Sequence, residues 1–198
     1  KSTHAMSPEK GLNAISVLMQ ILGHLEAEFS MEPVAEKYNR YIGMHYYGEA
    51  LGCEFEDEAS GKLTFNVGTL SYQDGTIKFG ASIRYPATLC MESVLERLTE
   101  QCKKAGIEIS VCSKMESLYI DEHTEFIQRL MEVYRKNSKD DNAVPLAIGG
   151  ATYARAIPNA VAFGPLFPYE EELAHEADEY LAIDSLEKMT LIYIEALQ

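Results

Sequence analysis

The sequence predicts an α+β fold, and two observations carry that prediction. The first is a β-hairpin, because residues 62–72 and 76–85 alternate apolar and polar side chains around Gln73-Asp74-Gly75, a typical hairpin turn. The second is the order of elements through residue 112, which reads helix, strand, strand, helix, strand. That order matches a split β-α-β unit of the ferredoxin-like, two-layer kind that lacks its first strand.

Apolar residues spaced three and four positions apart predict the helices. The first is expected to begin with Ser7 as its cap and Pro8 at its first helical position. Two short helices around a break at Gly43 and Gly48 are expected within residues 29–60. Further amphipathic helices are expected over residues 91–105, 122–136 and 185–197.

Short apolar runs predict the remaining strands. Ile107, Ile109 and Val111 alternate as a third strand, and residues 144–148 and 160–163 are typical of buried strands. The missing first strand of the ferredoxin-like sheet would end just before Lys1. Because its loss would expose a sheet edge, we expect the chain to begin inside a longer protein.

The composition of the chain limits which binding partners and which cellular compartment are expected. The 198 residues carry 31 Asp and Glu against 17 Lys and Arg, a formal net charge of −14 that would repel the phosphates of a nucleic acid. No apolar run approaches the roughly 20 residues of a membrane span, so no membrane association is expected. The four cysteines have no paired spacing, which favours free thiols and a cytoplasmic location: Cys53, Cys90, Cys102 and Cys112.

Three strings follow one another between residues 149 and 180: Gly-Gly-Ala-Thr-Tyr-Ala-Arg, Ala-Phe-Gly-Pro-Leu-Phe-Pro and Ala-His-Glu-Ala-Asp-Glu-Tyr. In this order they resemble the C-terminal signature of the peptidase V-type metallodipeptidases. These belong to the superfamily of carnosinase, aminoacylase and glutamate carboxypeptidase. The resemblance implies that His175, in the third string, is a metal ligand. It also implies two zinc ions in the complete protein, with manganese or cobalt as alternatives.

Two further residues gain a role from the same resemblance. Lys1 to Gly11 reads KSTHAMSPEKG, which is similar to the family's lid motif, and implies that His4 stabilises the oxyanion formed on the substrate carbonyl. The string Ile83-Arg84-Tyr85-Pro86 is similar to one whose arginine binds the free carboxylate of the dipeptide. From the residues alone, an exposed His4 and a solvent-facing Arg84 at a strand end are the alternatives.

The double-glycine string implies a turn that faces the substrate. Gly149 and Gly150 would permit a close backbone approach, Thr152 would offer a hydroxyl, and Arg155 would offer a second contact to an anion. Because glycine pairs also occur in ordinary turns, the expectation of a substrate-facing turn rests on the whole string Gly-Gly-Ala-Thr-Tyr-Ala-Arg and not on the two glycines alone. Residues 170–172, three consecutive glutamates, are interpreted instead as a solvated helix start.

Together these features predict two parts. Residues 1–120 would form a lid domain with a helical insertion at 29–60, and residues 121–198 would form the closing segment of an α/β zinc-peptidase catalytic domain. The implied function is hydrolysis of dipeptides by a metal-activated water. The other metal ligands and the general base would come from the missing catalytic half of the same protein or from a neighbouring copy. The alternative is a non-catalytic ferredoxin-like module for dimerisation or ligand binding.

Overall fold

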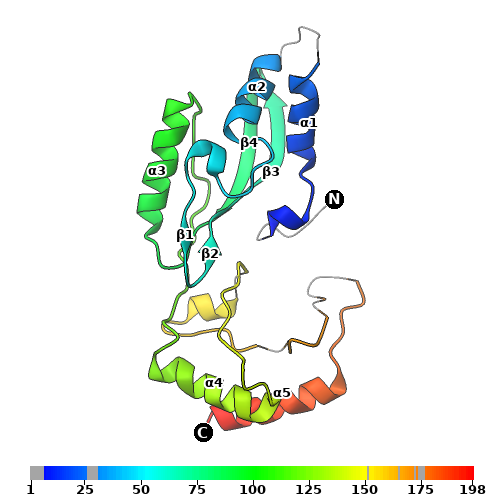
Figure 1. Ribbon diagram of the computed structural model, residues 1–198, viewed down its shortest axis with the longest axis vertical. Helices are drawn as coiled ribbons and strands as arrows, with labels where there is room; N and C mark the ends of the chain where they lie inside the picture. Colours follow the sequence, from blue (N-terminus) through cyan, green and yellow to red (C-terminus); the bar gives the residue numbers. More distant parts are fainter. Residues whose placement is uncertain (1–6, 26–30, 151, 165, 172, 174–176) are drawn as a thin grey trace. The chain divides into compact units, whose positions relative to one another are not determined.

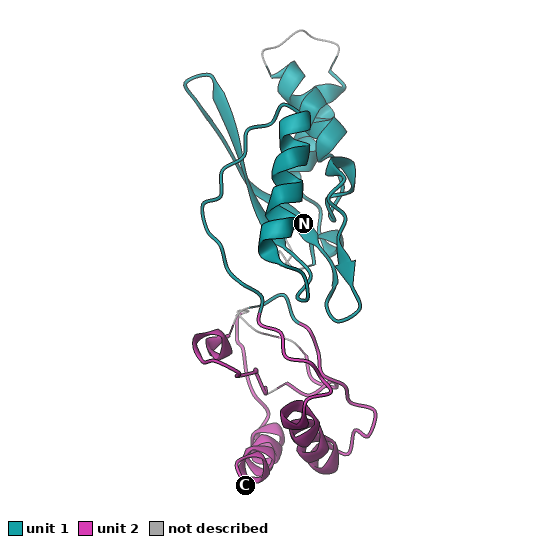
Figure 2. Ribbon diagram, turned by 90° about the vertical axis from the view of Figure 1, so that its left-hand side faces the viewer, with its two compact units in different colours: residues 1–117, 148–150 teal, residues 118–147, 151–198 magenta. Residues whose placement is uncertain are grey.

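The computed structural model describes residues 7–25, 31–150, 152–164, 166–171, 173 and 177–198. It divides into two compact units, coloured separately in Figure 2. Unit 1 comprises Lys1–Ser117 and Ile148–Gly150, and unit 2 comprises Leu118–Ala147 and Ala151–Gln198. Among the described helices, none has the length and apolar character needed to cross a bilayer. The identification of residues 1–120 as a lid and of 121–198 as a catalytic segment stays a prediction.

The hairpin predicted from the sequence is confirmed. Strand β3 (Thr64–Gln73) pairs antiparallel with β4 (Thr76–Arg84), and Gln73 lies opposite Thr76. The turn between them consists of Asp74 and Gly75, with φ angles of 51° and 76°. Two successive left-handed residues are the backbone that an Asp-Gly pair adopts in a tight hairpin. A shorter antiparallel pair, β1 (Glu56–Asp57) and β2 (Gly61–Lys62), precedes it.

Three helices cover one face of this hairpin to form the core of unit 1, and Figure 1 shows them around β3 and β4. They are α1 (Ala14–Gly23), α2 (Glu32–Tyr41) and α3 (Met91–Lys104). Leu63, directly before β3, and Phe65 and Val67 within β3 are buried in this core, as alternation predicts. The helices contribute the following buried residues: Met19, Ala35, Tyr38, Val94, Leu98 and Cys102.

The predicted start of the first helix is wrong. Residues Pro8–Lys10 form a separate 3-10 turn, η1, and α1 begins only at Ala14. The cap is Asn13, whose side-chain oxygen accepts hydrogen bonds from the backbone N of Ile15 and Ser16 at 2.9 and 3.2 Å. Its Nδ2 donates to the backbone O of Val67 at 2.7 Å, so the same side chain also fixes α1 to β3.

The predicted third strand is also wrong. Residues 107–111 form no ladder, although Ile107 and Ile109 pack against the core of unit 1. A strand needs a neighbour, and β4 pairs with β3 alone among the described residues. At Phe65, near the start of β3, the outer edge of the strand is occupied, because the N–H of Phe65 donates to the backbone O of Tyr46 at 2.7 Å. The structure therefore agrees with an α+β fold, built on two small antiparallel sheets.

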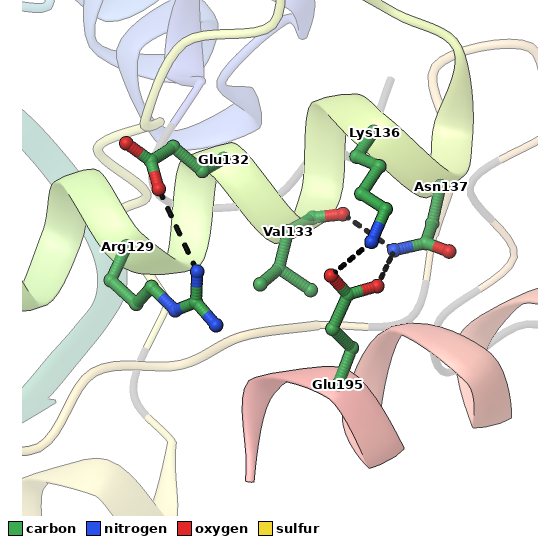
Figure 3. A network of polar contacts seen from close by, with 6 residues as sticks. All are labelled: Arg129, Glu132, Val133, Lys136, Asn137 and Glu195. Carbon is green, nitrogen blue, oxygen red and sulfur yellow. Dashed lines mark hydrogen bonds and ion pairs between the residues drawn. The ribbon is translucent and has the colours of Figure 1, made fainter. Parts of the chain in front are cut away.

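Unit 2 is organised by two helices, α4 (Glu125–Ser138) and α5 (Ile183–Ala196). Its buried core consists of Val133, Phe167, Met189 and Ile192. At one end of the helix pair the carboxylate of Glu195 accepts from Lys136 Nζ at 2.6 Å and from Asn137 Nδ2 at 2.9 Å (Figure 3). A 3-10 turn, η3 (Tyr153–Ala156), lies between the helices in sequence.

The two buried strands expected at 144–148 and 160–163 do not form. Val144, Leu146 and Ile148 are instead 61%, 81% and 57% exposed. An apolar run becomes a buried strand only when a neighbouring strand accepts its backbone hydrogen bonds, and the described residues supply none here.

Candidate functional site

The arginine singled out by sequence is placed at a defined position of the hairpin. Arg84 ends β4 and lies directly opposite Thr64, the first residue of β3. Directly opposed residues have their side chains on the same face of a sheet. Because the neighbouring Leu63 and Phe65 point into the core, Thr64 and Arg84 lie on the face away from the helices.

The guanidinium of Arg84 has no partner in the described part of the chain. Its Nε atom is buried and meets no acceptor there, and no described acid forms an ion pair with it. Leaving a buried donor unpaired typically costs about 1–3 kcal/mol. The missing partner of Arg84 is not explained by a shortage of acidic residues, since the chain has 31 Asp and Glu against 17 Lys and Arg. Among the described residues, the Nε of Arg84 is therefore a buried donor without an acceptor.

The other arginines give a useful comparison. Four of the six have a partner: Arg40 lies over the ring of Tyr41, Arg97 and Arg129 form ion pairs, and Arg135 donates to a backbone oxygen. Within the described residues, the guanidinium groups of Arg84 and Arg155 have none. These are the two arginines to which the sequence motifs assign an anion.

The loop after Arg84 is held in place by an acid that the motifs did not identify. Asp57 is the last residue of β1, and its Oδ2 accepts from the backbone N and the hydroxyl of Thr88 at 2.9 and 2.7 Å. Its Oδ1 accepts from the N and hydroxyl of Ser60 at 2.6 and 2.8 Å. The same Ser60 hydroxyl accepts from the backbone N of Ala87 at 2.7 Å. Asp57 and Ser60 thus fix residues 87–88 directly after the end of β4.

These contacts also set the protonation of Asp57. Partial burial raises the pKa of its carboxyl, but the hydrogen bonds from Thr88 and Ser60 together outweigh that effect. The pKa is lowered from 3.8 to about 2, so the group is ionised at neutral pH. A second attachment lies beside it, because Ser117 donates its backbone N–H to the Tyr85 hydroxyl at 3.1 Å and its own hydroxyl to Ala87 O at 2.9 Å. Arg84 therefore precedes a loop that is fixed on two sides.

The double-glycine turn is divided between the two units. Gly149 and Gly150 belong to unit 1, together with Arg84, whereas Thr152 and Arg155 belong to unit 2. Gly150 has no positive φ, and an added Cβ would meet only Ile148 Cδ1 at 3.8 Å, so its local surroundings do not require glycine. Thr152 caps η3 by accepting from the backbone N of Ala154 at 3.3 Å. Arg155 is half-buried within η3.

His4 and His175 lie outside the described residues, as does Glu172. Within the described part of the chain, no three His, Cys, Asp or Glu side chains come together in a way that could hold a metal ion. A catalytic zinc needs about three protein ligands and an open position. The described residues therefore do not by themselves fit a zinc site.

The segment that leads toward His175 is anchored by its aromatic residues. The ring of Phe163 packs edge-on against Tyr193, whose hydroxyl donates to the backbone O of Phe163 at 2.9 Å. Phe167 is buried in the core of unit 2 and stacks on Tyr169 with ring centroids 5.6 Å apart. Lys188 Nζ lies 5.0 Å from the centre of the Phe167 ring. In the string Ala-Phe-Gly-Pro-Leu-Phe-Pro, the two phenylalanines thus have a structural role.

The interpretation of residues 170–172 as a solvated helix start is corrected at Glu170. This residue ends a turn, and its carboxylate accepts from the hydroxyl of buried Ser185 and from the backbone N of Phe167 at 2.8 Å. Both bonds lower the pKa of Glu170, the one from Ser185 most strongly. The side chain joins the turn to the start of α5.

The sequence motifs did not single out three residues whose positions the structure shows to matter locally. Asp57 and Glu170 make the contacts described above, and Thr64 lies opposite Arg84. Asp57-x-x-Ser60-Gly61 is a turn pattern that indicates the local bonds of Asp57, but its bond to Thr88 spans 31 positions. Nothing in the sequence around Thr64 distinguishes it from an ordinary strand residue.

The whole chain is similar to curated proteins that are named "Putative dipeptidase". It is 34% identical over 200 residues to one from Staphylococcus haemolyticus (strain JCSC1435). It is 32% identical over 198 residues to those from Staphylococcus aureus strains USA300 and MRSA252. Each alignment covers 100% of this chain and 42% of the relative, so the chain spans less than half the length of the relatives it matches. No protein-family model matches the chain.

Proposed function

We propose that this chain is part of a dipeptide hydrolase and that Arg84 binds the free C-terminal carboxylate of the substrate. The observation that carries the proposal is the buried Nε of Arg84, which has no acceptor in the described part of a strongly acidic chain. A planar guanidinium binds a carboxylate through two parallel hydrogen bonds, which a compact ammonium group cannot do. The dipeptidase names of the relatives supply the class of substrate. They favour this function over a non-catalytic dimerisation or ligand-binding module.

Other residues of the chain complete the proposal. Arg155 provides a second contact to an anionic group of the substrate, and Gly149, Gly150 and Thr152 form the turn that faces it. His4 donates a hydrogen bond to the substrate carbonyl oxygen as negative charge develops there. His175 contributes one ligand to a zinc site whose other ligands and general base lie outside this chain, with manganese or cobalt as alternatives. Zinc, when bound, supplies an activated water for peptide-bond hydrolysis.

A cytoplasmic location fits the cysteines of this proposed enzyme. Cys53, Cys90, Cys102 and Cys112 are all free thiols, and Cys53 and Cys102 are buried. Burial raises the pKa of Cys53 to about 11, which keeps it as an unreactive thiol at neutral pH. Free thiols of this kind are typical of a reducing compartment.

The proposal is tested with the complete gene product and a panel of dipeptides. Arg84→Ala should raise KM by roughly 30- to 1000-fold with little change in kcat, because the lost contact is present in the ground state and the transition state alike. His4→Ala should instead lower kcat by about 10²- to 10³-fold. Arg97→Ala is the matched control, since Arg97 lies on α3 and pairs with Glu100 at 3.6 Å. Absence of dipeptide hydrolysis, or an unchanged KM in Arg84→Ala, would contradict the proposal.

A further inference from the structure

Two of the three unpaired buried polar atoms in unit 1 lie on directly opposed residues. In the described part of the chain, Asn39 Oδ1, Thr64 Oγ1 and Arg84 Nε are buried side-chain atoms without a hydrogen-bond partner. Asn39 lies in α2, where its Nδ2 donates to the backbone O of Met19 at 2.7 Å. Thr64 and Arg84 are paired across β3 and β4, so their Cβ atoms are on the order of 5 Å apart on one face.

The hydrogen-bonding capacities of the Thr64 hydroxyl and the Arg84 guanidinium define which ligand group could pair with both. A guanidinium only donates hydrogen bonds, whereas a threonine hydroxyl donates one and accepts others. Thr64 and Arg84 form no hydrogen bond with each other. A single acceptor between them would pair both donors, and an ionised carboxylate is an acceptor with room for several such bonds. A cationic or purely donating ligand would leave Arg84 unpaired.

We propose that Thr64 is a second substrate-binding residue, whose hydroxyl donates a hydrogen bond to the same carboxylate that Arg84 binds. The inference rests on the proposed function for the identity of that carboxylate, the free C-terminus of a dipeptide. Arg84 supplies the positive charge and a bidentate hydrogen-bonded contact to the carboxylate. Thr64 fixes the carboxylate from the neighbouring strand, which distinguishes a terminal carboxylate from a neutral amide that offers only one acceptor oxygen.

The test measures binding without hydrolysis. The probe is Ala-Ala with a methylene in place of its peptide carbonyl, and the comparison ligand is the same compound with a C-terminal amide. Both are titrated calorimetrically into the complete gene product, with Thr64→Val as the variant that removes the hydroxyl at nearly constant volume. Thr64→Ser is the matched control that keeps the hydroxyl. Because the Thr64 hydroxyl has no partner in the described chain, Thr64→Val should fold as well as the natural protein.

We expect the natural protein and Thr64→Ser to bind the acid more tightly than the amide. Thr64→Val should lose roughly 10- to 100-fold in affinity for the acid and little for the amide, as expected for a hydrogen bond to a charged group. Equal affinity of Thr64→Val and the natural protein for the acid would overturn the inference. So would equal affinity of the natural protein for the acid and the amide. If the protein hydrolyses no dipeptide but prefers the acid, and Thr64→Val loses that preference while Thr64→Ser keeps it, the proposed function is overturned and the role of Thr64 is supported.

Discussion

The carboxylate of Asp57 accepts hydrogen bonds from both the backbone N and the hydroxyl of Thr88, at 2.9 and 2.7 Å, although the two residues are 31 positions apart. This contact joins the end of β1 to the loop that follows Arg84. A long side chain binds a ligand well only when its backbone is held in place by neighbouring contacts. Asp57 therefore fixes the loop directly after Arg84, which would hold the backbone of Arg84 if this arginine binds the substrate as proposed.

The first prediction concerns Asp57→Asn. An amide in this position keeps one acceptor oxygen but turns an NH2 group toward donors that the carboxylate satisfied. We expect the amide protons of Ala87 and Thr88 to exchange faster with solvent and the free energy of unfolding to fall by about 1–2 kcal/mol. Hydrogen exchange of these two amides measures the local effect. The matched control is Glu58→Gln at the exposed neighbouring position, which should change neither quantity. Unaltered exchange in Asp57→Asn would show that the contact does not hold the loop.

The second prediction concerns pH. The folded-state pKa of Asp57 is lowered to about 2 from 3.8, so its contribution to stability is fully present above pH ~4. That contribution is lost as the pH falls toward 2, because the carboxyl is then increasingly protonated in the folded state as well as in the unfolded state. We expect the stability difference between the natural protein and Asp57→Asn to shrink by on the order of 1 kcal/mol between pH 5 and pH 2.5. Urea denaturation of both proteins at several pH values measures this difference. A difference that stays constant over this range would contradict the assigned pKa.

The third prediction concerns the anchor of unit 2. Phe167 is 3% exposed and stacks between Tyr134 and Tyr169, with ring centroids 6.1 and 5.6 Å away. Phe167→Ala should reduce the free energy of unfolding of unit 2 by about 3–5 kcal/mol, since it removes buried surface and leaves a cavity. Leu166→Ala, one position earlier and 47% exposed, should change it by about 0.5 kcal/mol or less. Denaturation curves of the two variants that coincide would rule out an anchoring role for Phe167.

Local signals in the sequence predicted the hairpin and the helices, because their determinants lie within a few residues. The Asp74-Gly75 pair defines its turn by its own backbone preferences. The strand expected at 107–111 failed for the opposite reason. Alternating Ile107, Ile109 and Val111 satisfy the side-chain pattern of a strand, but a strand also needs a neighbour for its backbone, and sequence pattern does not report one.

The same distinction applies to the candidate site. Arg84 was identified because it lies within a recognisable string of residues. Thr64 was not, because the role that we propose for it rests on burial and on its register with Arg84, which only the paired strands reveal. Asp57 was missed because its partner Thr88 lies in a different turn. Residues that position or complete a site through distant contacts are therefore the part that sequence alone does not predict.

The last prediction concerns the metal. Within the described residues no cluster of His, Cys, Asp or Glu could hold an ion, so His175 needs ligands from elsewhere if it binds zinc. In the complete gene product, His175→Ala should lower the bound zinc per chain and the dipeptidase activity together, because a site that loses one of its few protein ligands binds the ion much more weakly. Metal content by plasma mass spectrometry and turnover are measured on the same preparations. His123→Ala is the matched control, since His123 lies just before α4 at an exposed position and should leave both quantities unchanged. Full zinc content and full activity in His175→Ala would show that this histidine is not a ligand. Lost activity with full zinc content would give it a role in catalysis or folding that does not pass through the metal.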